Sequence, residues 1–136
     1  MAMGTIKFEL VSPERLLVSR DVDMVVVPGE EGDFGVLPGH ALFLTLVRPG
    51  LIDIYNGDEV SAQIFVAGGF SEVNSDCCTV LAEEAVNLVD VERSDIEGRI
   101  SRNQQAISVA NSDEDVTAYK TDLAIGHALL QCFDRK

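Results

Sequence analysis

The chain has 136 residues, and ten lysine and arginine residues stand against 23 aspartate and glutamate residues, which gives a formal net charge of −13. Such an excess of acid disfavours nucleic acid as a partner, since phosphate contacts need clustered basic side chains, and it argues against direct binding to anionic lipids. No apolar run approaches the roughly 20 residues that cross a membrane, so we expect no direct membrane insertion.

The first half of the chain predicts β-strands. Up to about Leu88, apolar and polar residues alternate with period two, as they do in half-buried strands. Asn56-Gly57 separates two such runs and predicts a hairpin, because a type I′ turn needs positive φ at both central positions. The expected inward-facing positions are Ile6, Phe8, Leu10, Val22, Met24, Val26, Val60, Ala62, Ile64 and Val66.

Breaks in this pattern set the number of strands. Pro49-Gly50, Gly68-Gly69 and residues 74–76 each predict the end of a strand. About nine or ten short strands then fit, which favours a β-sandwich or flattened barrel.

A glycine-rich segment over residues 29–41 stands out within the predicted strands. Its Pro38-Gly39 pair predicts a turn, and the acidic residues Glu30, Glu31 and Asp33 precede that turn. An exposed, rigid, acidic loop is suited to docking on another protein. His40, which follows the turn, is interpreted as an interface residue or a turn-stabilising hydrogen bonder.

From Asp90 the period changes to that of helices. Asp90 is the expected N-cap of a first helix, and Ser112 with Asp115 resembles a capping box for a second. The short polar connection between them predicts an antiparallel hairpin. Its apolar stripes are Ile96, Ile100 and Ile107, then Val116, Tyr119, Leu123, Leu130 and Phe133; Asn103-Gln104 and Gly126-His127 interrupt them.

The sequence offers little for catalysis. The two histidines lie in different halves, and no motif of a hydrolase, metalloprotease or phosphate-binding loop occurs. Cys77 and Cys78 are adjacent and Cys132 is distant, which is neither a disulfide framework nor a metal-binding spacing and favours a reducing compartment. We expect no catalytic residue, no metal site and no cofactor.

Four motifs in order resemble the epsilon subunit of bacterial F-type ATP synthase, and the likeness covers essentially the whole chain. They are E-G-D-F-G-V-L-P-G-H-A from Glu31, L-V-R-P-G-L-I-D-I from Leu46, F-V-A-G-G-F-S-E-V from Phe65 and V-L-A-E-E-A from Val80. The opening V-S-P-E-R from Val11 resembles the form found in alphaproteobacteria. Leu42 departs from the family, in which many members have proline.

The resemblance implies a ten-stranded β-sandwich over residues 1–88 and a helical hairpin over residues 89–136. It implies a non-catalytic central-stalk subunit that couples rotation of the c-ring to ATP synthesis through the gamma subunit. By the same resemblance, Glu30, Glu31, Gly32 and Asp33 face arginine-bearing loops of the c-ring, and Pro38, Gly39 and His40 face gamma. The implied location is peripheral, on the cytoplasmic face of the bacterial inner membrane.

The resemblance is weakest in the helical tail. ATP-binding members carry [I/L]-D-x-x-R-A, whereas residues 89–94 read V-D-V-E-R-S and keep Asp90 and Arg93 as a vestigial nucleotide site. Lys120 is the only base on the expected second helix, roughly Asp113 to Phe133, so the phosphate-binding arginines are missing. An acidic helix also fits poorly against acidic segments of the alpha and beta subunits, which predicts weak or no inhibition of ATP hydrolysis.

Two alternatives stay open on the sequence alone. One is an ATP-sensing module that uses the helical hairpin, with Asp90 and Arg93 holding the nucleotide. The other is a small enzyme that uses His40 beside Asp33. Neither accounts for the order of the four motifs.

Overall fold

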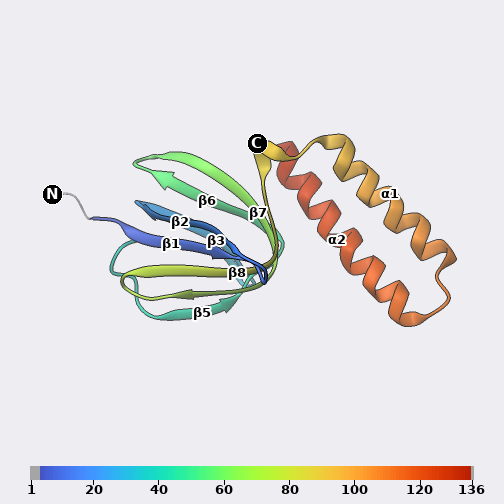
Figure 1. The fold of residues 1–136 in the computed structure, drawn as a ribbon, viewed down its shortest axis with the longest axis horizontal. Helices are drawn as coiled ribbons and strands as arrows, with labels where there is room; N and C mark the ends of the chain where they lie inside the picture. Colours follow the sequence, from blue (N-terminus) through green and yellow to red (C-terminus); the bar gives the residue numbers. More distant parts are fainter. Residues whose placement is uncertain (1–3, 136) are drawn as a thin grey trace. The chain divides into compact units, whose positions relative to one another are not determined.

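The computed structural model describes residues 4–135 and divides the chain into two compact units, Met1–Asn87 and Leu88–Lys136. The first unit is built of strands and the second of helices (Figure 1). Each unit is described on its own below.

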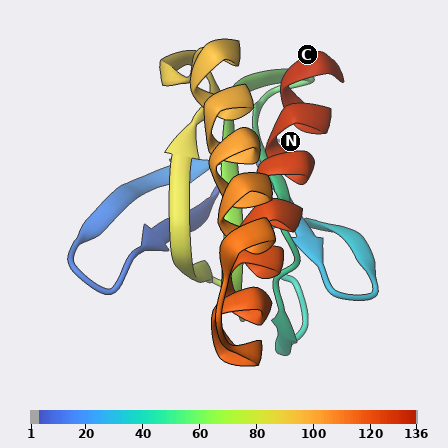
Figure 2. The same ribbon diagram turned by 90° about the vertical axis from the view of Figure 1, so that its right-hand side faces the viewer.

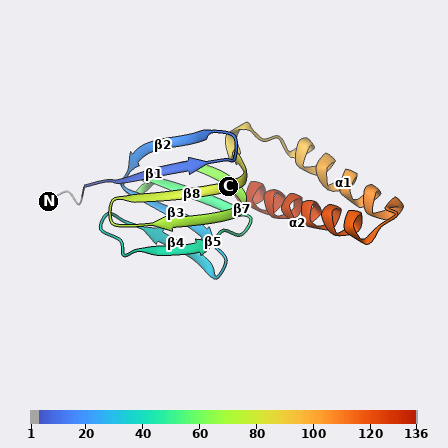
Figure 3. The same cartoon turned by 60° about the horizontal axis from the view of Figure 1, so that its bottom comes forward.

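The N-terminal unit contains eight strands. They are β1 (Ile6–Val11), β2 (Leu16–Val22), β3 (Met24–Gly29), β4 (Gly32–Val36), β5 (Phe43–Leu46), β6 (Gly50–Asn56), β7 (Glu59–Val73) and β8 (Cys77–Asn87). The strand order is β2-β1-β8-β7-β6-β3-β4, with β5 paired to β7. β1 pairs antiparallel with β2 and parallel with β8, and these three strands lie side by side in Figure 3.

The β-sandwich expectation is confirmed, but the count of ten strands is too high. β7 spans 15 residues; its first half pairs with β6 and its last four residues with β5. The predicted break at Gly68-Gly69 therefore lies inside one strand, where both glycines have positive φ. The structure has one continuous strand where the glycine pair predicted the end of one, because glycine lets β7 change direction without ending.

The core follows the period-two pattern with one shift. Ile6, Phe8 and Leu10 are buried as expected. In β3, however, the fully buried residues are Val25 and Val27 rather than Met24 and Val26. A bend at Asp23 separates β2 from β3, so the alternation restarts with the opposite parity.

The prediction that Val60 is a core residue is also wrong. Its side chain remains 42% exposed near the start of β7, whereas both Ile64 and Phe65 are buried further along that strand. A strand covered on both faces has two buried neighbours in sequence, which alternation alone does not predict.

The C-terminal unit contains a 3₁₀ turn, η1 (Leu88–Asp90), and two helices, α1 (Arg93–Val109) and α2 (Asp113–Arg135). The helices run antiparallel, gold and red in Figure 2, as the short connection predicts. Ser112 caps α2, because its Oγ accepts a hydrogen bond from the Asp115 N–H at 3.1 Å. The expected Asp90 cap of α1 is wrong: Asp90 lies in η1, and the N-cap of α1 is Glu92, without a side-chain bond.

Two of the four residues that interrupt the apolar stripes lie at the seam between the helices, whereas Gln104 and His127 are exposed. Asn103 and Gly126 are both buried. A Cβ atom on Gly126 would lie 3.1 Å from Cγ1 of Ile100, so glycine is what permits this close approach of α2 to α1. Neither helix, over its described residues, combines the length and apolar character needed to cross a bilayer.

Candidate functional site

The acidic segment forms the turn of the β3–β4 hairpin. Gly29 pairs with Gly32, so Glu30 and Glu31 are the two residues of the turn. Gly32 has φ of 141°, a conformation that favours glycine. Both glutamates are exposed, and neither takes part in the ion pairs found within residues 4–135. The turn thus presents two carboxylates to solvent on a rigid two-stranded base.

Asp33 differs from the two glutamates because it has a basic partner. Nη2 of Arg48 donates to Oδ1 of Asp33 at 2.5 Å, and Nη1 donates to the Gly29 carbonyl at 2.6 Å. One guanidinium group therefore holds both strands of the hairpin just below the turn. The sequence shows Asp33 as a third acidic charge but does not show that Arg48, fifteen residues away, reaches it.

The backbone also joins the acidic turn to the next strand. The N–H of Glu30 donates to the Leu46 carbonyl at 2.9 Å, and the N–H of Arg48 donates to the Pro28 carbonyl at 3.0 Å. Gly29 and Val47 form an isolated antiparallel bridge. The turn and the end of β5 are consequently one connected piece of structure.

β5 carries an exposed apolar surface that sequence reasoning missed. β5 pairs with β7 and, among the described strands, with no other. Leu42 is 78% exposed, Leu44 66% and Leu46 57%, and Phe70 on β7 pairs with Leu46. Together with Phe43, these residues form what we call the apolar strip: Leu42, Phe43, Leu44, Leu46 and Phe70.

The apolar strip has the composition of an interaction surface. An exposed edge strand with this many large apolar side chains invites association, and proteins normally protect such edges. Leu44, Thr45, Leu46 and Phe70 line a shallow, open depression. The signal available in the sequence was the run L-F-L-T-L from Leu42, which is apolar without alternating.

Pro38, Gly39 and His40 form a tight turn beside this strip. The His40 N–H donates to the Leu37 carbonyl at 3.2 Å, and the Gly39 N–H donates to the Ser75 carbonyl at 2.9 Å. The imidazole of His40 lies 6.4 Å, centroid to centroid, from the Phe43 ring. The ring of Phe43 in turn packs edge-on against Phe34 of β4 at 5.1 Å. Aromatic contacts thus continue from the turn across the strip to the acidic hairpin.

His40 and Asp33 have separate partners. Nδ1 of His40 lies 2.7 Å from the Ala41 carbonyl oxygen, whereas Asp33 pairs with Arg48. A general base needs its orienting carboxylate within hydrogen-bond reach, and this pair of residues does not supply that arrangement.

Of the two residues for which the sequence predicts a vestigial nucleotide site, Arg93 has partners within the helical hairpin. Arg93 forms ion pairs with Asp134 of α2 and with Glu97 one turn along α1. The hydrogen bond that Arg93 donates to Asp134 raises the pKa of Arg93 above its ordinary value. Asp90 lies in η1, apart from α1. The guanidinium group expected to contact a phosphate already has two carboxylate partners.

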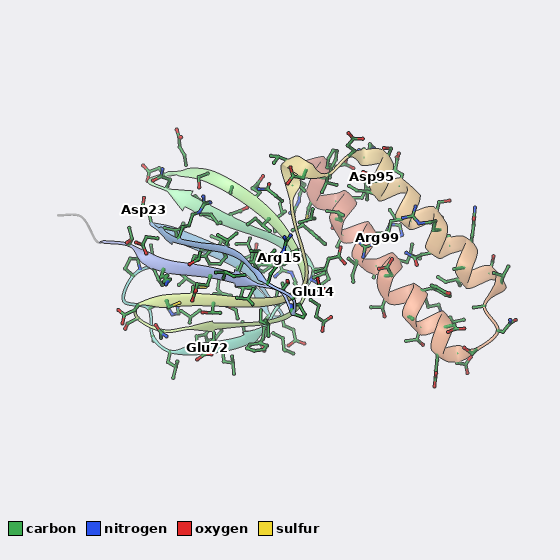
Figure 4. All side chains as sticks on the ribbon, in the orientation of Figure 1. Glu14, Arg15, Asp23, Glu72, Asp95 and Arg99 are labelled. Atoms are coloured by element: carbon green, nitrogen blue, oxygen red, sulfur yellow. The ribbon has the colours of Figure 1, made fainter. Side chains whose placement is uncertain are left out.

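A second polar cluster joins the two helices at their middle, where Figure 4 labels Arg99 on α1. Nη2 and Nε of Arg99 donate to the two carboxylate oxygens of Asp122 at 2.7 and 3.1 Å. Nδ2 of the buried Asn103 donates to Asp122 Oδ2 and to the Arg99 carbonyl. The hydrogen bond from Arg99, reinforced by Asn103, holds the pKa of Asp122 below its ordinary value despite partial burial. Sequence reasoning missed this cluster and treated Asn103 only as an interruption.

The three cysteines are free thiols. Burial raises the pKa of the Cys78 thiol to about 11, so it is protonated at neutral pH. Cys77 is half-buried, and its Sγ lies 3.8 Å from a carboxylate oxygen of Glu9. Within residues 4–135, no three His, Cys, Asp or Glu side chains converge on a point where a metal ion could bind.

Comparison with solved structures supports the fold. A chain of the Euglena gracilis mitochondrial ATP synthase complex of OSCP, F1 and c-ring superposes with a TM-score of 0.77 at 20% identity, covering 93% of this chain and 79% of that one. A chain of the Tetrahymena thermophila mitochondrial ATP synthase central stalk and c-ring superposes with a TM-score of 0.68 at 13% identity, covering 98% and 99%. At these identities the likeness concerns the fold.

Comparison of sequences is more specific. The ATP synthase epsilon chain of Rhodospirillum rubrum is 49% identical over 126 residues, which cover 93% of this chain and 94% of that protein. The ATP synthase epsilon chain of Paramagnetospirillum magneticum is 56% identical over 110 residues, covering 81% and 83%. Residues 5–88 match the family of the ATP synthase delta/epsilon chain β-sandwich domain. The resemblance seen in the four motifs is thereby confirmed, and the chain belongs to the ATP synthase epsilon chain family.

Proposed function

We propose that this chain is a non-catalytic subunit of the central stalk that couples rotation of the c-ring to ATP synthesis through gamma. The observation that carries this proposal is the direct connection between the acidic turn and the apolar strip. A rotor subunit that transmits torque between two partners needs its two contact surfaces on one rigid body. The hydrogen bonds at residues 28–30 and 46–48 supply that rigidity.

The gamma subunit is proposed to dock on the apolar strip and on the turn Pro38, Gly39 and His40. A long-lived contact that must bear load is best built from buried apolar side chains with a polar rim. Leu44 and Leu46 supply such side chains, and His40 lies at the border of the same surface.

The c-ring is proposed to meet the acidic segment Glu30, Glu31, Gly32 and Asp33. The polar loops that the family resemblance implies for the ring carry arginine, and carboxylates on a rigid turn complement them. This placement puts the chain at the cytoplasmic face of the inner membrane as a peripheral component, held there by its partners.

The proposal is tested by two double variants in the assembled complex. Leu44→Ser with Leu46→Ser should abolish co-purification with gamma, because it removes the apolar contact, while the exposed positions leave the fold intact. Glu30→Gln with Glu31→Gln should retain gamma but lose proton-coupled ATP synthesis. Loss of gamma in the glutamate variant, or unchanged synthesis, would contradict the assignment of the turn to the c-ring.

The helical hairpin is proposed to bind ATP weakly or not at all. Arg93 and Arg99 are already paired with Asp134 and Asp122, so a nucleotide phosphate would have to displace these carboxylates. Calorimetry of the full chain with ATP should therefore show no micromolar binding. A micromolar dissociation constant would instead favour the ATP-sensing alternative.

A further inference from the structure

We infer that Arg48 determines which acidic residues of the turn a basic partner meets: it compensates the charge of Asp33 and leaves Glu30 and Glu31 as the recognition pair. This inference deepens the proposed contact with the c-ring and rests on it. By this inference the three carboxylates are not equivalent: Glu30 and Glu31 contact the basic partner, whereas Asp33 is neutralised by Arg48.

The geometry separates Asp33 from the two glutamates. Glu30 and Glu31 are the turn itself, whereas Asp33 lies on β4 opposite Pro28, one pair below the Gly29–Gly32 closure. The Asp33 carboxylate is directed to Nη2 of Arg48. Its charge is therefore compensated on the protein's own surface before any partner arrives.

The position of Arg48 is itself fixed. Its backbone N–H is bonded to Pro28, and its Nη1 is bonded to the Gly29 carbonyl. Because the backbone and the guanidinium group of Arg48 are both hydrogen-bonded, pairing with Asp33 costs little further conformational entropy. The pair therefore persists although the side chains of Arg48 and Asp33 are 40% and 61% exposed. Lysine has a single ammonium group in place of the planar guanidinium fork, so it could not bind the Gly29 carbonyl and the Asp33 carboxylate with this geometry.

The charges then predict effects of opposite sign. Asp33→Asn releases the positive charge of Arg48 beside the glutamates, where it repels a basic partner. Arg48→Gln removes a positive charge, leaves Asp33 uncompensated and makes the net charge of the turn one unit more negative. Combining the two substitutions removes one charge of each sign and returns the turn to the net charge of the wild type.

Binding of the full chain, in complex with gamma, to purified c-ring is the experiment. Asp33→Asn should weaken binding about two- to fivefold, the range of one exposed ion pair, although Asp33 does not touch the ring. Arg48→Gln should bind as tightly as the wild type or more tightly. The double variant should return to the wild-type affinity, and the differences should shrink as salt is raised.

Arg20→Gln is the matched control, since it removes the same charge from an exposed arginine on β2, at the opposite end of the strand order. It should leave the affinity unchanged. Melting of each variant by circular dichroism establishes that its fold is intact.

Two outcomes would overturn the inference alone. If Asp33→Asn and the double variant are equally weak, Asp33 contacts the ring directly. If Arg48→Gln and the double variant are both weak, Arg48 serves only to hold the turn together. Unchanged binding in Glu30→Gln with Glu31→Gln would instead overturn the proposed c-ring contact itself, and this inference with it.

Discussion

Asp122 on α2 makes the stability of the helical hairpin depend on pH. Its carboxylate accepts hydrogen bonds from Arg99 on α1 and from the buried Asn103. These partners stabilise the charged form, which is why the pKa of Asp122 is lowered in the folded hairpin. An acid whose folded pKa is depressed contributes stability above its unfolded pKa and loses that contribution as the pH falls through the folded pKa.

Asp122→Asn should therefore destabilise the hairpin at pH 6 by about 1 kcal/mol, a value reduced for solvent screening because the side chain is partly exposed. The difference from the wild type should shrink below a pH of about 4, where the unfolded carboxyl begins to protonate. Thermal melts followed at the helical circular dichroism signal measure it, since α1 and α2 are the α-helices of the described chain.

Asp95→Asn is the matched control for this measurement. Asp95 is an exposed carboxylate on the first turn of α1, without an ion pair in residues 4–135 (Figure 4). Its substitution should change stability less than that of Asp122 at pH 6. Equal effects of the two substitutions would mean that the Arg99–Asp122 ion pair adds nothing to the stability of the hairpin.

Gly69 is a residue whose backbone, rather than side chain, matters. Its φ is 103°, and a Cβ atom there would lie 1.8 Å from the Leu81 carbonyl oxygen of β8. Gly69→Ala must therefore push β7 away from β8 as well as strain the backbone, and should cost about 3 kcal/mol or more.

Gly57→Ala provides the comparison, because Gly57 also has positive φ, at 67°, but open space around its Cβ position. It should cost about 1 kcal/mol, the strain alone. Urea denaturation of the full chain measures the loss of folding free energy in each variant. Similar losses at both positions would show that β8 can move away at Leu81 without a cost in stability.

At the scale of elements, the sequence was most informative where alternation and turn chemistry agree. The buried residues of β1 and the hairpin at Asn56-Gly57 follow from period two and from a turn that needs positive φ. The eight-strand count did not follow, since Gly68 and Gly69 resemble a break in sequence but act as a change of direction within β7. Local patterns do not distinguish a strand that ends from one that continues in another pairing.

The candidate site divides in the same way. The acidic turn and the Pro38-Gly39 turn are local features, and the sequence predicts them. The Arg48–Asp33 pair and the Arg99–Asp122 pair join residues 15 and 23 positions apart across different elements, which no local pattern shows. The apolar strip escaped notice because an edge strand with apolar residues on both faces looks like an ordinary buried one.

At the scale of the whole molecule, the two units carry different kinds of interaction surface. The strand unit combines exposed leucines with two exposed glutamates on a two-stranded base, which are the features on which the proposed contacts with gamma and the c-ring rest. In the helical unit Arg93 and Arg99 pair with carboxylates of α2, and α2 begins with Asp113, Glu114 and Asp115. An outward surface so acidic gives little attraction toward acidic segments of a catalytic subunit.

This contrast predicts that the helical unit can be removed without releasing ATP hydrolysis. A chain that ends at Leu88 keeps the acidic turn, Arg48 and the apolar strip, so it should still join gamma and support proton-coupled synthesis in the assembled complex. Its ATPase activity should equal that of the full-length complex, because we expect the acidic hairpin to make no inhibitory contact. Quantifying the truncated chain relative to gamma in the purified complex ensures that assembly is complete. A several-fold rise in hydrolysis at full assembly would show that the hairpin inhibits despite its charge, through contacts other than electrostatic attraction.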